Sequence, residues 1–166
     1  MNWRTLAGYL ENRIFEMDVH YSRITNLCYE AKEYGFLSVQ VFPGMLWLCE
    51  PVLRDSQVEV CAMLSYPHGG MTIPQKVAES LDAVAKGATH LMVTMDGRQF
   101  QSGKYDYTES EMRTVKQANP DKFVKFILET EYLKDDQMKK ACEIAIRAGI
   151  DGIVTSTWLY NALDEK

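Results

Sequence analysis

Apolar residues recur at helical spacing in three stretches of the chain, and each stretch ends at a glycine, namely Gly35, Gly87 and Gly149. A glycine takes up the left-handed conformation of a helix C-terminus at little cost, so the three stretches predict helices that stop there. The expected buried positions are Ile24, Leu27, Cys28 and Ala31; Val77, Leu81, Val84 and Ala85; and Met138, Ala141, Cys142, Ala145 and Ala148.

An apolar run follows each glycine within a few residues and predicts a strand. Two further runs are almost continuously apolar, as expected for strands covered on both faces. The predicted strands are 36–42, 58–64, 88–95, 123–128 and 150–155, with a weak first strand near 13–15. Helices and strands therefore alternate, which predicts an α/β fold with a parallel sheet and right-handed crossovers. No linker or low-complexity segment interrupts the pattern, so we expect a single domain over residues 1–166.

Composition narrows the class of protein. The chain has 166 residues, of which 46% are hydrophobic, enough for one core. It has no apolar run near the roughly 18 residues of a membrane helix, and its first residues carry charge where a secretory signal is apolar. A net charge of −5 without a basic cluster disfavours nucleic acid and anionic membranes as partners. The four cysteines form no CxxC pair, so we expect buried free thiols and a cytoplasmic location.

Several stretches between Asp18 and Thr157 resemble one known family. They read NLCYEAKEYGFLSVQVFP, VEVCAMLSYPHGG, GATHLMV with QSGKYDY, KFILETEYLKDD and ACEIAIRAGIDGIVTST. In order and spacing they are similar to the deoxyribose-phosphate aldolases, class I aldolases built on a TIM barrel. That barrel needs eight βα units, whereas this chain supplies about six strands. The resemblance therefore implies an incomplete TIM-barrel-like (β/α) fold with five to six parallel strands.

The departures from the family bear on activity. Val154 stands where the family's K-T-S-T-G strand has its Schiff-base lysine, and a valine has no amine to form an imine. Met92 stands where the family has a proton-relaying aspartate, and Trp158 replaces a glycine of the phosphate site. The family's second lysine and its phosphate loops lie on strands beyond Thr157. We therefore assign no catalytic residue, expect Met92 and Val154 to be packing residues, and expect no Schiff-base aldolase activity.

Polar side chains gather where the predicted strands end, and these residues define a candidate pocket: His68, Asp96, Lys125, Glu129, Thr155 and Ser156, with Glu11, Arg98 and Thr130 near the same ends. One interpretation is a rebuilt enzyme site in which Asp96 and Glu129 act with His68 in acid–base or metal chemistry. The interpretation we favour is that they cap helices and satisfy loops, because no ligand spacing such as HxH occurs. We expect no metal and no cofactor. Lys125, a charge inside a strand, could act as a relocated amine nucleophile, but an inherited structural role is favoured.

An incomplete barrel would leave strand edges and part of its interior uncovered. Trp158, Leu159 and Tyr160 directly follow the last predicted strand and are suited to anchor an interface. We expect a homodimer; a different partner protein, or a tail that fills its own barrel, are the alternatives. The predicted function is binding or scaffolding, with the small-molecule ligand unknown. The alternatives are the rebuilt enzyme site and an aldolase-type lyase completed by a second chain.

Overall fold

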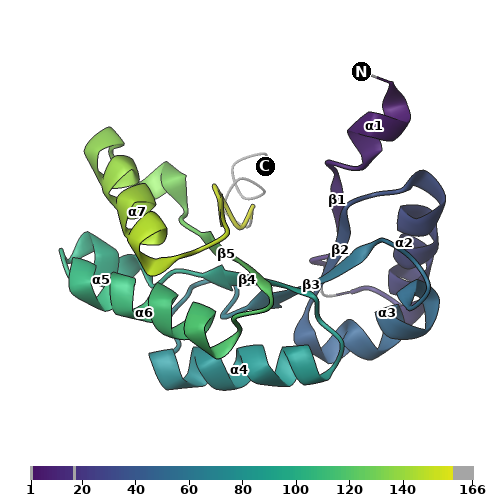
Figure 1. Ribbon diagram of the computed structural model, residues 1–166, viewed down its shortest axis with the longest axis horizontal. Helices are drawn as coiled ribbons and strands as arrows, with labels where there is room; N and C mark the ends of the chain where they lie inside the picture. The colour runs from purple at the N-terminus through teal and green to yellow at the C-terminus, as the bar shows by residue number, and fades with distance from the viewer. Residues whose placement is uncertain (1, 17, 159–166) are drawn as a thin grey trace. The chain divides into compact units, whose positions relative to one another are not determined.

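The structure, a computed structural model of the chain, describes residues 2–16 and 18–158 (Figure 1). The strands in this part of the chain are β1 (Glu11–Arg13), β2 (Ser38–Val41), β3 (Glu59–Leu64), β4 (His90–Thr94), β5 (Phe123–Ile127) and β6 (Gly152–Val154). The α-helices are α1 (Trp3–Ala7), α2 (Tyr21–Tyr34), α3 (Leu46–Leu53), α4 (Ile73–Ala85), α5 (Gly97–Gln101), α6 (Tyr105–Ala118) and α7 (Asp135–Ala148). The chain forms two compact units: residues up to 63 with 82–90, and residues 64–81 with those from 91 onward.

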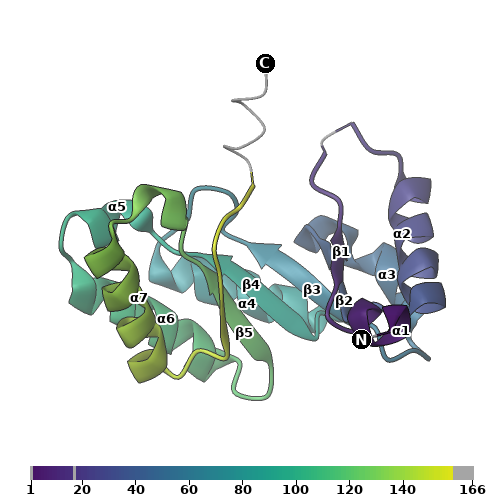
Figure 2. The ribbon, with the colours of Figure 1, turned by 90° about the horizontal axis from the view of Figure 1, so that it is seen from above.

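The first unit carries strands in the order β1-β2-β3, paired in parallel. Helices α2 and α3 pack against each other on one side of β1 and β2 (Figure 2). The buried positions of α2 are the four predicted ones, and the helix ends at Gly35 in left-handed conformation, also as predicted. In this packing the Cys28 and Cys49 thiols are hydrogen-bonded, and that bond together with burial raises the pKa of Cys49.

The first strand begins earlier than expected. β1 starts at Glu11, which pairs with Ser38, the first residue of β2. The Glu11 carboxylate accepts hydrogen bonds from Ser38 Oγ (3.1 Å) and Gln40 Nε2 (2.5 Å). Glu11 therefore lies at the amino end of its strand, and its expected place among the strand carboxyl ends was wrong.

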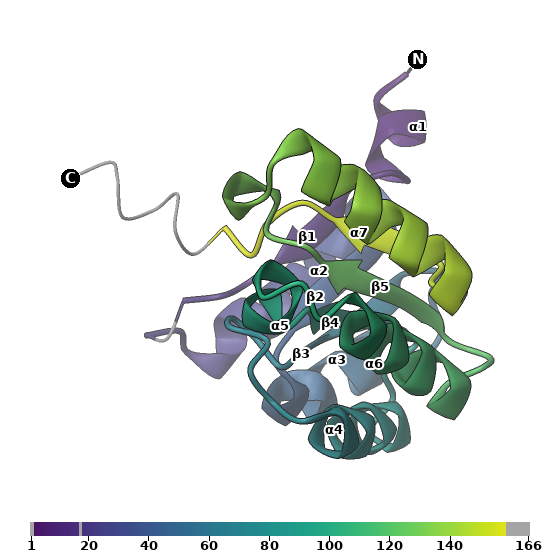
Figure 3. The ribbon, with the colours of Figure 1, turned by 90° about the vertical axis from the view of Figure 1, so that its left-hand side faces the viewer.

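The second unit carries strands in the order β4-β5-β6. β5 and β6 run parallel, with Lys125 opposite Gly152 and Ile127 opposite Val154. Helices α6 and α7 pack together and cover one face of β5 (Figure 3). The apolar core residues of this unit include five that are fully buried, namely Phe100, Met112, Val115, Phe126 and Ile144.

Helix α4 buries a different face from the one its apolar pattern predicts. Leu81 is 48% exposed and Ala85 is exposed, whereas Lys76, Ser80 and Ala83 are fully buried. The polar members of this face are hydrogen-bonded: Lys76 to Glu111 and Ser80 to Asn119. A buried polar group is tolerated when it is paired, so a face selected by hydrogen bonding overrode the apolar stripe.

The cysteines and the helix lengths test two smaller expectations. All four cysteines are free; Cys28, Cys49 and Cys61 are buried as expected, but Cys142 is only partly buried. Within the described residues, each helix is too short or too polar to cross a membrane.

Candidate ligand-binding pocket

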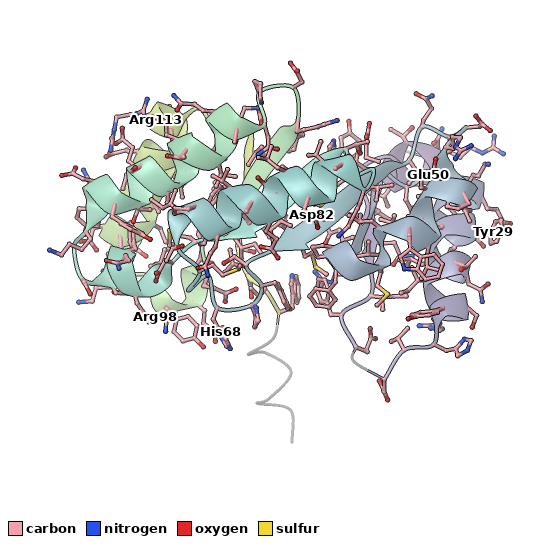
Figure 4. All side chains as sticks on the ribbon, turned by 90° about the horizontal axis from the view of Figure 1, so that it is seen from below. Tyr29, Glu50, His68, Asp82, Arg98 and Arg113 are labelled. Carbon is pink, nitrogen blue, oxygen red and sulfur yellow. The ribbon has the colours of Figure 1, made fainter. Side chains whose placement is uncertain are left out.

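A pocket of the second unit lies at the carboxyl ends of β4 and β5, beside the loop that follows β3. Its volume is about 630 Å³. Figure 4 shows His68 and Arg98, which both line it, on one side of the unit and Arg113 on the opposite side. The lining residues are Pro67, His68, Thr94, Met95, Gly97, Arg98, Gln101, Leu128, Glu129, Tyr132 and Leu133.

Two polar atoms of this lining are buried without a hydrogen-bond partner among the described residues. They are Oγ1 of Thr94, a residue only 1% exposed, and Oε2 of Glu129. Ser65 Oγ and Thr157 Oγ1, which follow β3 and β6, are in the same state. An unsatisfied buried polar atom costs about 1–3 kcal/mol, so native structures rarely retain one without a reason. Their gathering at the strand carboxyl ends makes this edge the candidate binding surface.

The position of Glu129 is fixed by Thr157, in the segment that follows β6. Its second oxygen, Oε1, accepts a hydrogen bond from the Thr157 backbone N–H. Tyr66, in the loop after β3, donates from its hydroxyl to the Thr157 carbonyl at 2.8 Å. Glu129 itself adopts a positive φ of 51°, which is uncommon for a residue with a side chain and typical of functional sites. One carboxylate oxygen is thus anchored, and the other is buried beside the pocket without a hydrogen-bond partner among the described residues.

The turn after β4 supplies the facing wall. The Asp96 carboxylate accepts hydrogen bonds from the backbone N–H groups of Arg98 (3.1 Å) and Gln99 (3.3 Å), and so caps the short helix α5. The Arg98 guanidinium lies 3.7 Å from the Asp96 carboxylate and rests on Gly70, where an added Cβ would come within 2.1 Å of Nη2. Asp96 therefore has a structural task that the favoured interpretation of the sequence assigned to it.

Of the predicted pocket residues, His68 and Glu129 line the same pocket. Asp96 faces α5 instead, and Lys125 is buried inside β5. Thr155 is exposed and its carbonyl accepts the Thr130 N–H, while Ser156 Oγ accepts the Trp158 N–H. Over the residues that the structure describes, no three His, Cys, Asp or Glu side chains come together as metal ligands.

The positions that depart from the family differ in how deeply they are buried. Met92 is 3% exposed in β4, and Val154, at the end of β6, is partly buried opposite Ile127. Trp158, the first predicted interface residue, is half exposed, whereas Leu159 and Tyr160 lie outside the described residues.

Sequence reasoning missed the residues that complete the site. Thr94 reads as one more position of an apolar strand, and its orphaned hydroxyl is visible only in three dimensions. Lys76 and Glu111 form a buried ion pair behind the pocket wall, but 35 residues separate them in the chain. Lys76 stands among other polar residues of α4, so the sequence carried no signal that marked it as buried.

Alternating helices and strands, with the pocket at the strand carboxyl ends, define a (β/α) protein of the TIM-barrel type, as predicted. Its similarity to known proteins identifies the family. The chain is 39% identical to the deoxyribose-phosphate aldolase of Thermoanaerobacter pseudethanolicus over 155 residues, which cover 92% of this chain and 70% of that enzyme. This chain therefore belongs to the deoxyribose-phosphate aldolase family. No protein-family model matches it.

Solved structures agree with this assignment. A protein from Coccidioides immitis, named as a candidate deoxyribose-phosphate aldolase, is similar with a TM-score of 0.92 and 30% identity. That match covers 96% of this chain and 63% of the other. The deoxyribose phosphate aldolase of Aeropyrum pernix, described as a tetramer, is similar with a TM-score of 0.87 and 25% identity, over 96% of this chain and 67% of its own. The predicted TIM-barrel-like (β/α) fold is confirmed, with six parallel strands among the described residues.

Proposed function

We propose that this chain is a ligand-binding member of the aldolase family that forms no Schiff base. The observation that carries the proposal is Val154, which ends β6 where the resemblance places the family's lysine. Imine formation requires a lysine nitrogen to attack the substrate carbonyl and water to leave, and a valine supplies no such nitrogen. Met92 likewise supplies no group to move a proton at the corresponding place in β4.

Lys125 does not compensate for this loss. It pairs with Gly152, two residues before Val154 along β6, which places its backbone about 7 Å toward the amino ends of the strands. Its side chain is buried and it does not line the pocket. These observations give no support to a relocated Schiff base on Lys125 in this pocket.

The pocket favours a small hydroxylated molecule. A carboxylate oxygen only accepts hydrogen bonds, so Glu129 Oε2 calls for a donor, and the Thr94 hydroxyl both donates and accepts. Ligand hydroxyl groups have the donors and acceptors that both atoms lack, and a small shift of the lining would bring them into contact. Apolar residues such as Leu128 and Leu133 provide the remaining contact surface, and the volume suits a single small ligand.

The test uses 2-deoxyribose 5-phosphate, the compound class that the relatives' name indicates. Calorimetry should detect binding, and a coupled assay should detect no glyceraldehyde 3-phosphate release above a boiled control. Thr94→Val and Glu129→Gln should each weaken binding about tenfold, the effect of one average hydrogen bond. Thr114→Val is the control, because the Thr114 hydroxyl bonds within α6 to the Ser110 carbonyl. Absence of binding, or cleavage by the wild-type chain, would overturn the proposal.

Association and location belong to the same proposal. A homodimer is supported by the exposed indole of Trp158 after the last strand, and the oligomeric A. pernix aldolase is compatible with association. A cytoplasmic location is supported by the four free cysteines. A rebuilt acid–base site finds less support, because the Asp96 carboxylate is engaged in capping α5.

A further inference from the structure

Behind the pocket wall, Lys76 of α4 and Glu111 of α6 form an ion pair that is closed off from solvent. Their Nζ and Oε1 atoms are 2.6 Å apart, and both side chains are 0% exposed. Burial raises the pKa of the Glu111 carboxyl, and the neighbouring Lys76 ammonium opposes this shift. By contrast, the Lys86–Asp82 pair at the other end of α4 has the same 2.6 Å separation but side chains that are about half exposed.

The pair holds both ends of the turn that follows β4. Lys76 Nζ donates to the Thr94 carbonyl at 2.6 Å, and Glu111 Oε2 accepts the Asp96 backbone N–H at 3.3 Å. The loop after β3 closes on the same turn from another direction, because a Cβ on Gly69 would come within 2.0 Å of the Met95 carbonyl oxygen. Residues 94–96 make these contacts themselves and therefore have little freedom to move.

This turn carries the polar wall of the pocket. Thr94 and Met95 both line the pocket, and the Thr94 hydroxyl is buried beside it without a hydrogen-bond partner among the described residues. Asp96 caps α5 and so fixes the start of the helix that carries Arg98. A displacement of the turn would move all of these groups together relative to Glu129, whose carboxylate is held by the Thr157 backbone N–H in the segment after β6.

Stability alone does not account for this ion pair. The desolvation of two buried charges offsets most of their attraction, and a well-packed apolar pair in the same place is often equally stable. What an apolar pair cannot supply is the donor to Thr94 and the acceptor for Asp96.

We propose that Lys76 and Glu111 are positioning residues of the pocket, which hold the 94–96 turn so that Thr94, Met95 and Arg98 keep their places in the pocket lining. The ligand arm of this inference rests on the proposed function; the position of the turn does not.

The test compares two double variants by two readouts. Lys76→Met/Glu111→Leu removes the buried pair, and Lys86→Met/Asp82→Leu removes the exposed pair as the matched control. The first readout is the methyl resonance of Met95 in protein labelled at its methionine methyl groups, assigned with Met95→Leu. The second is the affinity for 2-deoxyribose 5-phosphate by calorimetry. Glu111→Gln, which keeps shape and an acceptor, is the conservative variant and serves if the double variant does not fold.

We expect the buried-pair variant to fold, to shift the Met95 resonance, and to bind about tenfold more weakly, as for loss of one ligand hydrogen bond. The control should change neither readout, and Glu111→Gln should fall between it and the buried-pair variant. An unchanged Met95 resonance in both Lys76→Met/Glu111→Leu and Glu111→Gln would overturn the inference. If the wild-type chain binds no 2-deoxyribose 5-phosphate, the proposed function fails, while the Met95 resonance still decides whether the pair positions the turn.

Discussion

Substitution of Gly69 by alanine tests the close approach that confines the pocket turn. Gly69 has a φ of +66°, and its added Cβ would lie 2.0 Å from the Met95 carbonyl oxygen and 2.9 Å from the Thr94 carbonyl oxygen. These neighbours are backbone atoms, so they cannot swing aside as a long side chain would. The matched control is Gly103→Ala, where φ is +74° and an added Cβ meets nothing within 4 Å.

The expected magnitude has two parts. A side chain in the left-handed region costs roughly 1–2 kcal/mol, and this part is common to both variants. Gly69→Ala must also push the Met95 backbone outward by more than an ångström, which as overpacking costs about 1–3 kcal/mol. We therefore expect Gly103→Ala to lose about 1–2 kcal/mol and Gly69→Ala about 2–5 kcal/mol of unfolding free energy.

Urea unfolding followed by circular dichroism measures both losses, provided that the two variants share one m-value. In thermal unfolding, each kcal/mol corresponds to about 2–4 °C for a chain of this size. Equal losses in the two variants would refute the reasoning, since the backbone contact of Gly69 would then contribute nothing.

Three further expectations follow from single side chains. Val154→Lys should restore no cleavage of 2-deoxyribose 5-phosphate in the coupled assay, because Met92 still moves no proton; measurable product release would contradict this. Burial raises the pKa of Asp151, but hydrogen bonds from Lys116 and from the Val124 backbone N–H outweigh it and hold that pKa below its ordinary value. This carboxylate therefore adds stability above its unfolded pKa and loses it as pH falls through the folded pKa, so Asp151→Asn should lower stability at neutral pH and flatten the acid limb of unfolding curves; an unchanged limb speaks against it. Light scattering should show a dimer that Trp158→Ser weakens, and a well-folded monomer of 19.0 kDa would remove that expectation.

Local patterns in the sequence predicted most of the elements. The stripe of α2 was right because its buried residues are apolar and the helix contributes them at one spacing. The stripe of α4 was wrong because its interior face contains Lys76 and Ser80, and apolar periodicity cannot detect polar residues that are buried by pairing. β1 begins at Glu11, earlier than predicted. The Glu11 carboxylate bonds to side chains of β2, and the sequence alone does not show that these residues are neighbours.

The candidate site was predicted only in outline. Of the residues predicted at the strand ends, His68 and Glu129 line one pocket. The roles within it depend on partners distant in the chain: Glu129 is fixed by Thr157, and the 94–96 turn by Lys76 and Glu111. No residue spacing encodes such contacts, so they could not be found before the fold was known.

The measurement closest to the central claim is borohydride trapping of the wild-type chain with 2-deoxyribose 5-phosphate, read by intact-protein mass spectrometry. The T. pseudethanolicus aldolase, run alongside, controls for the reagents. Reduction makes any imine between a lysine and the sugar carbonyl permanent, so each Schiff base formed remains as added mass. We predict no specific adduct on this chain, because Val154 offers no amine. A stoichiometric adduct on one lysine, Lys125 above all, would contradict it.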